Sequence, residues 1–206
     1  MRLPTTPVTT LQRALRDEVR HNNPAGRVVV AVDGADARGT ATFADGFAAV
    51  FAEADTAVFR ASIDGFRRPR TERNTDGDTE EGLYRDGFDY STFRRVLVEP
   101  FRDGAQTSAT TGFQLAAFDV DRDAPRESEW VTAPRDAVLI VDGPFLLRPE
   151  LRGVWNWSVW LEATPGPQWH PVLDLYRRDA RPTAAASALV DDSDPQHPFR
   201  VYQDFC

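Results

Sequence analysis

The chain has 206 residues, of which 41% are hydrophobic and 27% are charged, and this balance excludes a disordered or collagen-like chain. Its net charge of −8 disfavours nucleic acids and anionic membranes as partners, because both are negatively charged. No apolar run approaches the roughly 20 residues of a membrane span, and the N-terminus lacks the basic flank of a signal peptide. We therefore expect one cytoplasmic domain over residues 1–206, and a homodimer is left open.

The basic residues limit the chemistry that the chain can perform. All 24 are arginine, so neither a lysine base nor a lysine phosphate ligand can be present. The single cysteine is Cys206, and the three histidines, His21, His170 and His197, lie far apart in the sequence. We therefore expect no metal site, and oxygen-bearing and arginine side chains must carry any catalysis.

The first third of the chain predicts a βαβ unit. Apolar residues at helical spacing predict a helix from Thr9 to about His21, within an N-terminal region of residues 1–24, opened by a capping box of Thr9 and Gln12. An apolar strand over 27–33, a turn over 34–39 and a helix with Phe43 and Phe47 on its inner face follow. A second strand over 57–63 is expected beside the first.

The rest of the chain predicts further strands of the same sheet. Residues 64–87 are polar and predict a long functional loop, and Ser91 is expected to open a short helix that ends at Phe101. A strand pair is expected around 114–120 and 130–131, and buried strands over 137–142, 155–161 and 188–191. The spacing of Trp155 and Trp157 favours a core role, although an aromatic pocket is left open.

The turn after the first predicted strand contains part of a phosphate-binding pattern. The full P-loop motif, G-x-x-x-x-G-K-[ST], uses backbone amides, a lysine and a Mg²⁺-binding hydroxyl to hold a nucleotide. Both glycines are present, but threonine stands at the lysine position and alanine at the hydroxyl position. The sequence therefore predicts a degenerate P-loop built from Gly34, Asp36, Gly39, Thr40 and Ala41.

With these residues the chain resembles the uridine kinase-like family of P-loop kinases, in its compact actinobacterial form. The similarity runs from about residue 26 to residue 195, and it is carried by the segments 32–34, 60–70, 81–90, 139–151 and 190–195. It implies an α/β fold, namely a P-loop NTPase-like three-layer sandwich with a central, mostly parallel sheet.

The resemblance also implies roles for individual residues. In that family the aspartate after the second strand accepts a proton from the substrate hydroxyl, and Asp64 stands at this position. Asp142 ends the third strand, where the family has an acidic residue that helps to hold Mg²⁺; it is either an acid or a vestigial metal position. A helix cap or loop salt bridge for Asp64, and ordinary turn chemistry for Asp142, are the alternatives.

The long loop over residues 64–90 falls where the family surrounds its acceptor. The residues expected to bind substrate, including the arginine inside the P-loop, are Arg38, Phe66, Arg67, Arg70, Tyr84, Arg85, Phe88 and Phe118. The region 164–187, where the family carries an arginine-bearing lid, is short and rich in proline, and Arg177, Arg178 and Arg181 are its remaining candidates.

The departures from the family pattern all weaken ATP binding. Phosphoryl transfer depends on positioning and charge neutralisation, and losing several such contacts, each worth about 2–4 kcal/mol, would remove most of the catalysis. The leading hypothesis is a protein that binds a small organic molecule without cofactor or metal. Asp64 would transfer a proton in a cyclisation, isomerisation or elimination, as in specialised metabolism, and Arg38, Arg67 or Arg85 would orient anionic groups.

Two alternatives are kept. One is a divergent phosphotransferase that uses ATP with Mg²⁺ on a nucleoside or another small alcohol, with Arg38 in place of lysine. The other is a pseudokinase that binds a ligand without catalysis.

Overall fold

The computed structural model describes residues 2–73, 80–103, 112–163 and 170–202. Cys206, Trp169 and the first part of the predicted lid region lie outside these ranges. Within them, no helix has both the length and the apolar character needed to cross a bilayer.

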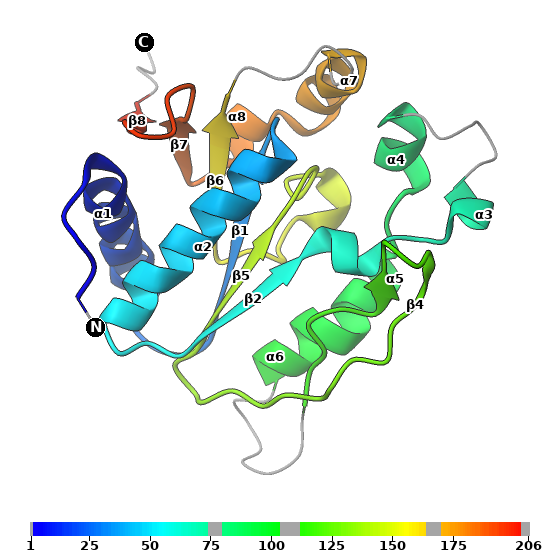
Figure 1. The fold of residues 1–206 in the computed structure, drawn as a ribbon, viewed down its shortest axis with the longest axis horizontal. Coiled ribbons are helices and arrows are strands. Elements are labelled where there is room, and N and C mark those ends of the chain that lie inside the picture. The colour runs from blue at the N-terminus through cyan, green and yellow to red at the C-terminus, as the bar shows by residue number, and fades with distance from the viewer. Residues whose placement is uncertain (1, 74–79, 104–111, 164–169, 203–206) are drawn as a thin grey trace.

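The centre of the molecule is a six-stranded sheet (Figure 1). Its strand order is β2 (Val58–Ser62), β5 (Val138–Asp142), β1 (Val28–Gly34), β6 (Trp157–Glu162), β7 (Ala188–Asp191) and β8 (Phe199–Val201). The first five strands are parallel, as predicted, and β8 pairs antiparallel with β7 at one edge. The prediction that β2 lies beside β1 was wrong, because β5 inserts between them and pairs with both.

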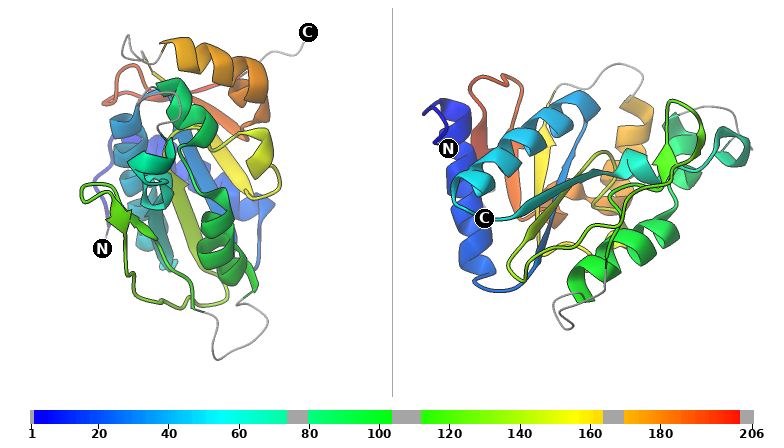
Figure 2. Two further views of the ribbon diagram at one scale, coloured as in Figure 1. Left: turned by 90° about the vertical axis from the view of Figure 1, so that its right-hand side faces the viewer. Right: turned by 60° about the horizontal axis from the view of Figure 1, so that its bottom comes forward.

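Helices α1 (Pro7–Asn22) and α2 (Ala37–Glu53) cover one face of the sheet (Figure 2). Leu15 and Val19 of α1 and Phe47 of α2 are fully buried there, and Phe47 packs on Trp157 at a centroid distance of 5.9 Å. The predicted helix start was late, because Thr6 forms the N-cap and its capping box partner is Thr9 rather than Gln12.

The other face carries a nearly continuous helical segment and the C-terminal helices. The segment consists of α5 (Tyr90–Phe93), the π-helical η2 (Arg94–Val98) and α6 (Glu99–Asp103), and Asp89 caps it in place of the predicted Ser91. The short helix η3 (Pro149–Leu151), α7 (His170–Ala180) and α8 (Pro182–Ala185) complete this layer. The sandwich therefore has three layers, as the sequence predicts.

The described parts of residues 63–90 are largely helical rather than one long loop. They form η1 (Ile63–Phe66), α3 (Arg70–Arg73) and α4 (Glu80–Asp86). The predicted strand pair is shorter than expected, since only β3 (Phe118–Asp119) and β4 (Ala124–Pro125) form a hairpin, with an isolated bridge between Phe113 and Val131. Trp157 is 2% exposed, which confirms its predicted core role, whereas Trp155 precedes β6 and is only half-buried against the core.

Candidate functional site

The carboxyl end of β1 is tied down by a fully buried carboxylate, Asp33. One of its oxygens accepts hydrogen bonds from the Leu147 amide at 3.0 Å and from the Tyr176 hydroxyl, and the other accepts from the Gly34 amide at 2.8 Å. Burial raises the pKa of Asp33 to about 7, although these donors oppose the shift. The end of β1 is thereby fixed to α7, directly before the P-loop region.

The N-terminus of α2 is capped by Asp36 from within the loop itself. The Asp36 carboxylate accepts hydrogen bonds from the amides of Arg38 at 3.2 Å and Gly39 at 2.9 Å. The Thr40 amide donates to the Asp36 backbone carbonyl at 2.9 Å. Three consecutive amides of the predicted phosphate cradle therefore donate to Asp36, and the helix begins at Ala37, earlier than the predicted end of the turn at Gly39.

A second carboxylate, Asp192, lies beside the same helix end. A Cβ atom at Gly39 would come within 2.9 Å of an Asp36 carboxylate oxygen and 3.5 Å of an Asp192 oxygen, so both carboxylates lie against Gly39. Asp192 is 7% exposed, and its pKa is raised by burial and by the charges of Asp36 and Asp191. The helix N-terminus, which attracts anions, already faces two acidic side chains of the chain itself.

The other P-loop positions are placed as the spacing predicts. Gly34 ends β1, and a Cβ atom there would come within 3.0 Å of Leu161 and Thr40, so the close packing requires a glycine. Thr40 is 1% exposed, and Ala41 is half-buried on α2. Arg38 is exposed, and its side chain makes no hydrogen bond or ion pair with any described residue.

Asp142 at the end of β5 is paired with an arginine. The Arg60 guanidinium donates to Asp142 at 2.8 Å and also to Asp45 of α2 at 3.1 Å. Burial raises the pKa of Asp142, Arg60 opposes this, and the nearby charge of Asp64 adds to it. Arg60 thus neutralises the carboxylate that the family resemblance assigns to Mg²⁺.

Asp64 follows β2 in the short helix η1. Its amide donates to the Ser62 hydroxyl at 3.3 Å, and its carboxylate accepts from Arg67 Nε at 2.7 Å. The Asp64 side chain is 35% exposed, so one side of it is open to solvent. The salt bridge expected as the alternative role of Asp64 is present, and the predicted role as a base remains a prediction.

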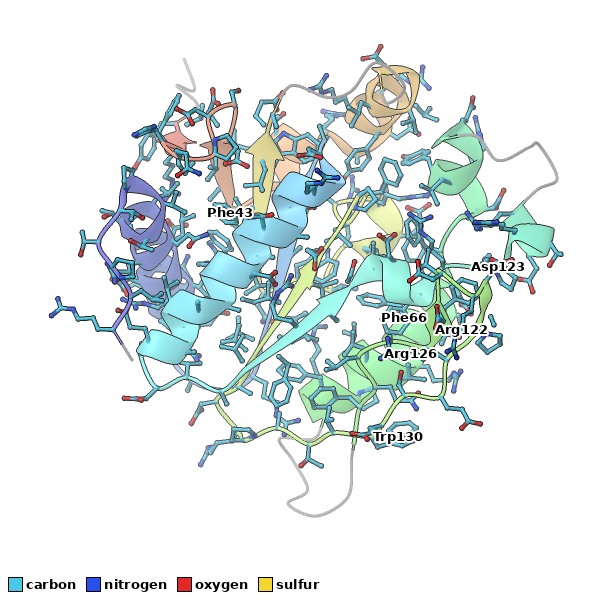
Figure 3. All side chains as sticks on the ribbon, in the orientation of Figure 1. Phe43, Phe66, Arg122, Asp123, Arg126 and Trp130 are labelled. Atoms are coloured by element: carbon cyan, nitrogen blue, oxygen red, sulfur yellow. The ribbon has the colours of Figure 1, made fainter. Side chains whose placement is uncertain are left out.

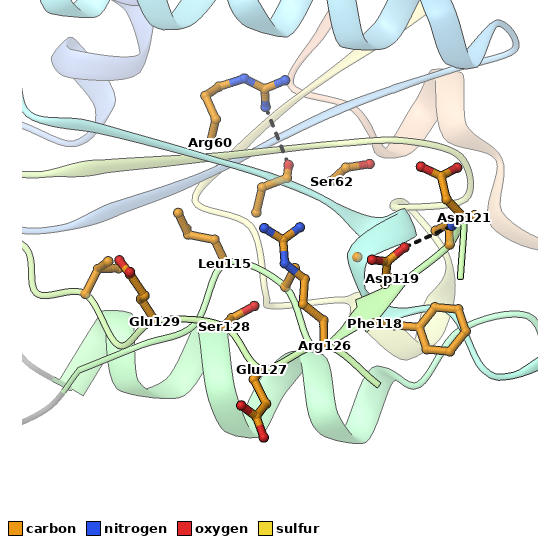
Figure 4. Close-up of a pocket in the computed structure, with 15 residues that line it drawn as sticks. Arg60, Ser62, Leu115, Phe118, Asp119, Asp121, Arg126, Glu127, Ser128 and Glu129 are labelled. Carbon is orange, nitrogen blue, oxygen red and sulfur yellow. Dashed lines mark hydrogen bonds between the residues drawn. The ribbon is translucent and has the colours of Figure 1, made fainter. Parts of the chain in front are cut away.

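A groove of about 770 Å³ runs along the outer edge of β2. We call it the β2 groove; its walls are residues 60–62 and Gly65 on one side and the segments 115–121 and 126–131 on the other (Figure 4). Arg60 and Arg126 supply positive charge, and the acidic residues are Asp119, Asp121, Glu127 and Glu129. In Figure 4 the Arg126 guanidinium extends into the groove, whereas Glu127 turns away from it.

Most of the predicted substrate-binding residues do not line this groove, although Phe118 does. Phe66, Tyr84 and Phe88 are 1%, 4% and 3% exposed and belong to the core (Figure 3). Phe66 packs on Phe93. The remaining arginines have other partners or positions: Arg67 pairs with Asp64, Arg85 pairs with Glu81 at 2.8 Å, and the Arg70 backbone amide donates to Asp123.

Sequence reasoning missed two features of the site. Arg126 and the acidic residues around it stand in an irregular segment without a motif, so only the fold brings them opposite β2. The cap by Asp36 had a signal, because aspartate is a preferred N-cap residue when it stands just before a helix. Because the turn was predicted to extend to Gly39, Asp36 was not expected to stand next to the start of the helix.

Comparison with known proteins agrees with this fold. No protein-family model and no curated protein matches the sequence. Among solved structures, the possible uridine kinase of Bacillus stearothermophilus superposes with a TM-score of 0.66 at 22% identity, covering 85% of this chain and 98% of that one. The chain therefore shares the α/β fold of that protein. D-glycerate 3-kinase from Cryptococcus neoformans superposes with a TM-score of 0.51 at 11% identity, covering 78% and 74% of the two chains.

The residues at the α2 N-terminus do not fit the nucleotide that this fold implies. A triphosphate needs free amide donors and cations, whereas here the amides of Arg38, Gly39 and Thr40 donate to Asp36, and Asp192 adds a second carboxylate. Within the described ranges, no three His, Cys, Asp or Glu side chains are grouped so that they could hold a metal ion.

Proposed function

We propose that this protein binds a small, polyhydroxylated organic molecule in the β2 groove and transfers a proton to or from it at Asp64, without ATP. The observation that carries the proposal is the Asp36 carboxylate on the amides of Arg38 and Gly39. Those amides would otherwise donate to a phosphate, and a carboxylate in their place repels one.

The lining of the β2 groove supports a polar ligand. Arginines donate hydrogen bonds, carboxylates accept them, and hydroxyl groups of a ligand can do both. Within the described residues, the side chains of Arg126 and Glu129 make no hydrogen bond or ion pair with the protein. They are therefore free to exchange water for the hydroxyl groups of a sugar, sugar acid or nucleoside.

Asp64 lies next to the lining of the β2 groove without being part of it, and it is the group to which we assign proton transfer. Its neighbours Ser62 and Gly65 line the β2 groove, and parallel α/β sheets bind ligands beyond the carboxyl ends of their strands. Arg67 holds one carboxylate oxygen at 2.7 Å and so orients the other. An isomerisation needs no further reactant, because the proton removed from one atom of the substrate is returned to another.

Calorimetric titration tests this function. The probes are uridine, fructose and D-glycerate, each with and without Mg·ATP. We expect binding of at least one probe that does not depend on Mg·ATP, and a loss of about tenfold or more in Arg126→Ala. Arg135→Ala is the matched control, because Arg135 is exposed later in the same irregular segment and does not line the groove.

The alternative phosphotransferase predicts the opposite result. Saturable binding of Mg·ATP to the wild-type protein, with phosphorylated probe as product, would overturn the proposal. For a probe that is turned over, Asp64→Asn should retain binding and lose turnover. Retained turnover in that variant would remove Asp64 from the mechanism, and binding without turnover in the wild-type protein would favour the pseudokinase alternative.

A further inference from the structure

The wall of the β2 groove that carries Arg126 and Glu129 lacks regular secondary structure. It runs from Arg126 to Val131, and backbone hydrogen bonds attach both of its ends. The Arg126 amide donates to the Ala117 carbonyl at 2.9 Å. Val131 and Phe113 each donate an amide hydrogen to the carbonyl of the other, also at 2.9 Å. The position of this backbone decides where the Arg126 and Glu129 side chains can meet a ligand (Figure 4).

Between its ends, this wall is held by the side chain of Gln114. Gln114 Nε2 donates a hydrogen bond to the Ser128 carbonyl at 2.9 Å. Ser128 lies between Arg126 and Glu129 in the sequence, so this bond fixes the backbone from which both side chains extend. Gln114 itself does not line the groove, whereas the next residue, Leu115, does.

The backbone of Gln114 is in turn held by the helical segment α5–η2–α6. The Gln114 amide donates to the Val96 carbonyl at 2.8 Å. Val96 lies in the π-helical η2, where the Glu99 amide donates to the carbonyl of Arg94, five residues earlier. In an α-helix the Val96 carbonyl would accept from residue 100, but Pro100 has no amide hydrogen. The helix therefore leaves this carbonyl without a donor, and Gln114 supplies one.

We propose that Gln114 is a positioning residue that fixes the wall carrying Arg126 relative to β2 and so determines which ligands the β2 groove accepts. Two hydrogen bonds of Gln114 connect Ser128 to Val96, which is 4% exposed and belongs to the core. Short π-helical turns are frequent at functional sites, and here one provides the anchor. The inference rests on the proposed function, because it concerns the same ligand.

A double-mutant cycle tests whether Gln114 acts through Arg126. The probe is whichever of uridine, fructose and D-glycerate binds best in calorimetric titration without Mg·ATP. Gln114→Met removes the hydrogen-bond donor with little change in volume, and we expect the affinity to fall severalfold. In an Arg126→Ala background the same substitution should have almost no effect, because the group that it displaces is already absent.

Gln12→Met is the matched control. Gln12 Nε2 also donates to a backbone carbonyl, that of Phe43 at 3.0 Å, and Gln12 does not line the groove. This variant should lower the melting temperature and keep the wild-type affinity. Equal losses of affinity in Gln12→Met and Gln114→Met would contradict the inference, and so would effects of Gln114→Met and Arg126→Ala that add. Thermal unfolding of each variant confirms that it is folded before titration.

Pro100→Ala tests the anchor in the helix. An alanine there would bring an amide hydrogen that competes with the Gln114 amide for the Val96 carbonyl. We expect severalfold weaker binding of the same probe without a lower melting temperature, because alanine is the better helix former. Wild-type affinity in this variant would contradict the inference.

A distance measurement tests the position of the wall without any ligand. Ala52 of α2 and Glu127 of the wall are exposed, so spin labels can be attached to Ala52→Cys and Glu127→Cys in a Cys206→Ser background. In pulsed electron paramagnetic resonance we expect one narrow distribution of distances between the labels. Gln114→Met should broaden or displace this distribution, and an unchanged distribution would overturn the inference.

These measurements separate the inference from the proposed function. If no probe binds the wild-type protein without Mg·ATP, the proposed function is wrong, and with it the ligand selection by Gln114. If a probe binds, and Gln114→Met changes neither its affinity nor the distance between the labels, the inference alone is wrong.

Discussion

The N-terminus of α2 and the β2 groove differ in whether their polar groups have hydrogen-bond partners within the protein. At the helix end, the amides of Arg38 and Gly39 donate to the Asp36 carboxylate, so the chain supplies its own anion. In the groove, the side chains of Arg126 and Glu129 have no partner among the described residues and face open space. The helix end is therefore closed by the chain's own groups, whereas the groove is open.

The largest effect is expected at Asp33, which anchors the strand that leads into the closed N-terminus of α2. Asp33→Ala would leave the Tyr176 hydroxyl buried without its acceptor, and the Leu147 amide would keep only the Tyr176 oxygen. We expect the free energy of unfolding to fall by about 3 kcal/mol, measured by urea denaturation. A loss below about 1 kcal/mol would show that water or a neighbouring carbonyl satisfies these donors.

Two arginines that line the β2 groove differ in whether their side chains have a partner within the protein. Arg60 pairs with the buried Asp142, so Arg60→Met leaves an uncompensated carboxyl group and should destabilise the protein by about 2 kcal/mol. Arg126 has no protein partner within the described ranges, so Arg126→Met should change the free energy of unfolding by less than about 0.5 kcal/mol. Equal effects in the two variants would contradict the comparison.

The pH dependence of stability tests the burial of Asp33. Its pKa is about 7 in the folded state and near the ordinary 3.8 in the unfolded state. The folded state therefore retains a proton that the unfolded state releases. The contribution of Asp33 to stability is complete below about pH 4 and declines as the pH rises to about 7, by at most about 1.4 kcal/mol per pH unit. Denaturation of Asp33→Asn over this range should lack that decline.

The cap at α2 predicts a smaller effect. Asp36→Ala removes the acceptor for two amides and should cost about 1 kcal/mol, partly offset because the repulsion of Asp192 is relieved. Asp36→Asn keeps an acceptor oxygen and should be nearly neutral. Thermal unfolding compares the two, and an alanine variant as stable as the asparagine variant would argue against the cap.

The sequence allowed the layers of the fold to be predicted because its strands are short apolar runs with distinct boundaries. Residues 28–34 are buried throughout, and the apolar run alone predicts that. The position of β5 between β1 and β2 could not be predicted, because strand order depends on long-range pairing that no local pattern records.

The candidate site was predictable where a motif marks it and not elsewhere. Gly34 and Gly39 frame the α2 N-terminus as expected, whereas Arg126 lines the β2 groove only because the hairpin folds back along β2. Aromatic residues such as Phe66 and Tyr84 have the same sequence signature in a binding site and in a core, and the structure places both in the core.

Amide chemical shifts of Arg38, Gly39 and Thr40 test the central claim most directly. In a two-dimensional NMR titration of the wild-type protein with Mg·ATP, we predict no saturable change in these three resonances, because the Asp36 carboxylate accepts from the Arg38 and Gly39 amides and its backbone carbonyl accepts from the Thr40 amide. Removal of the carboxylate in Asp36→Ala should shift the Arg38 and Gly39 resonances without any ligand. Saturable shifts of the wild-type resonances on addition of Mg·ATP would contradict the account.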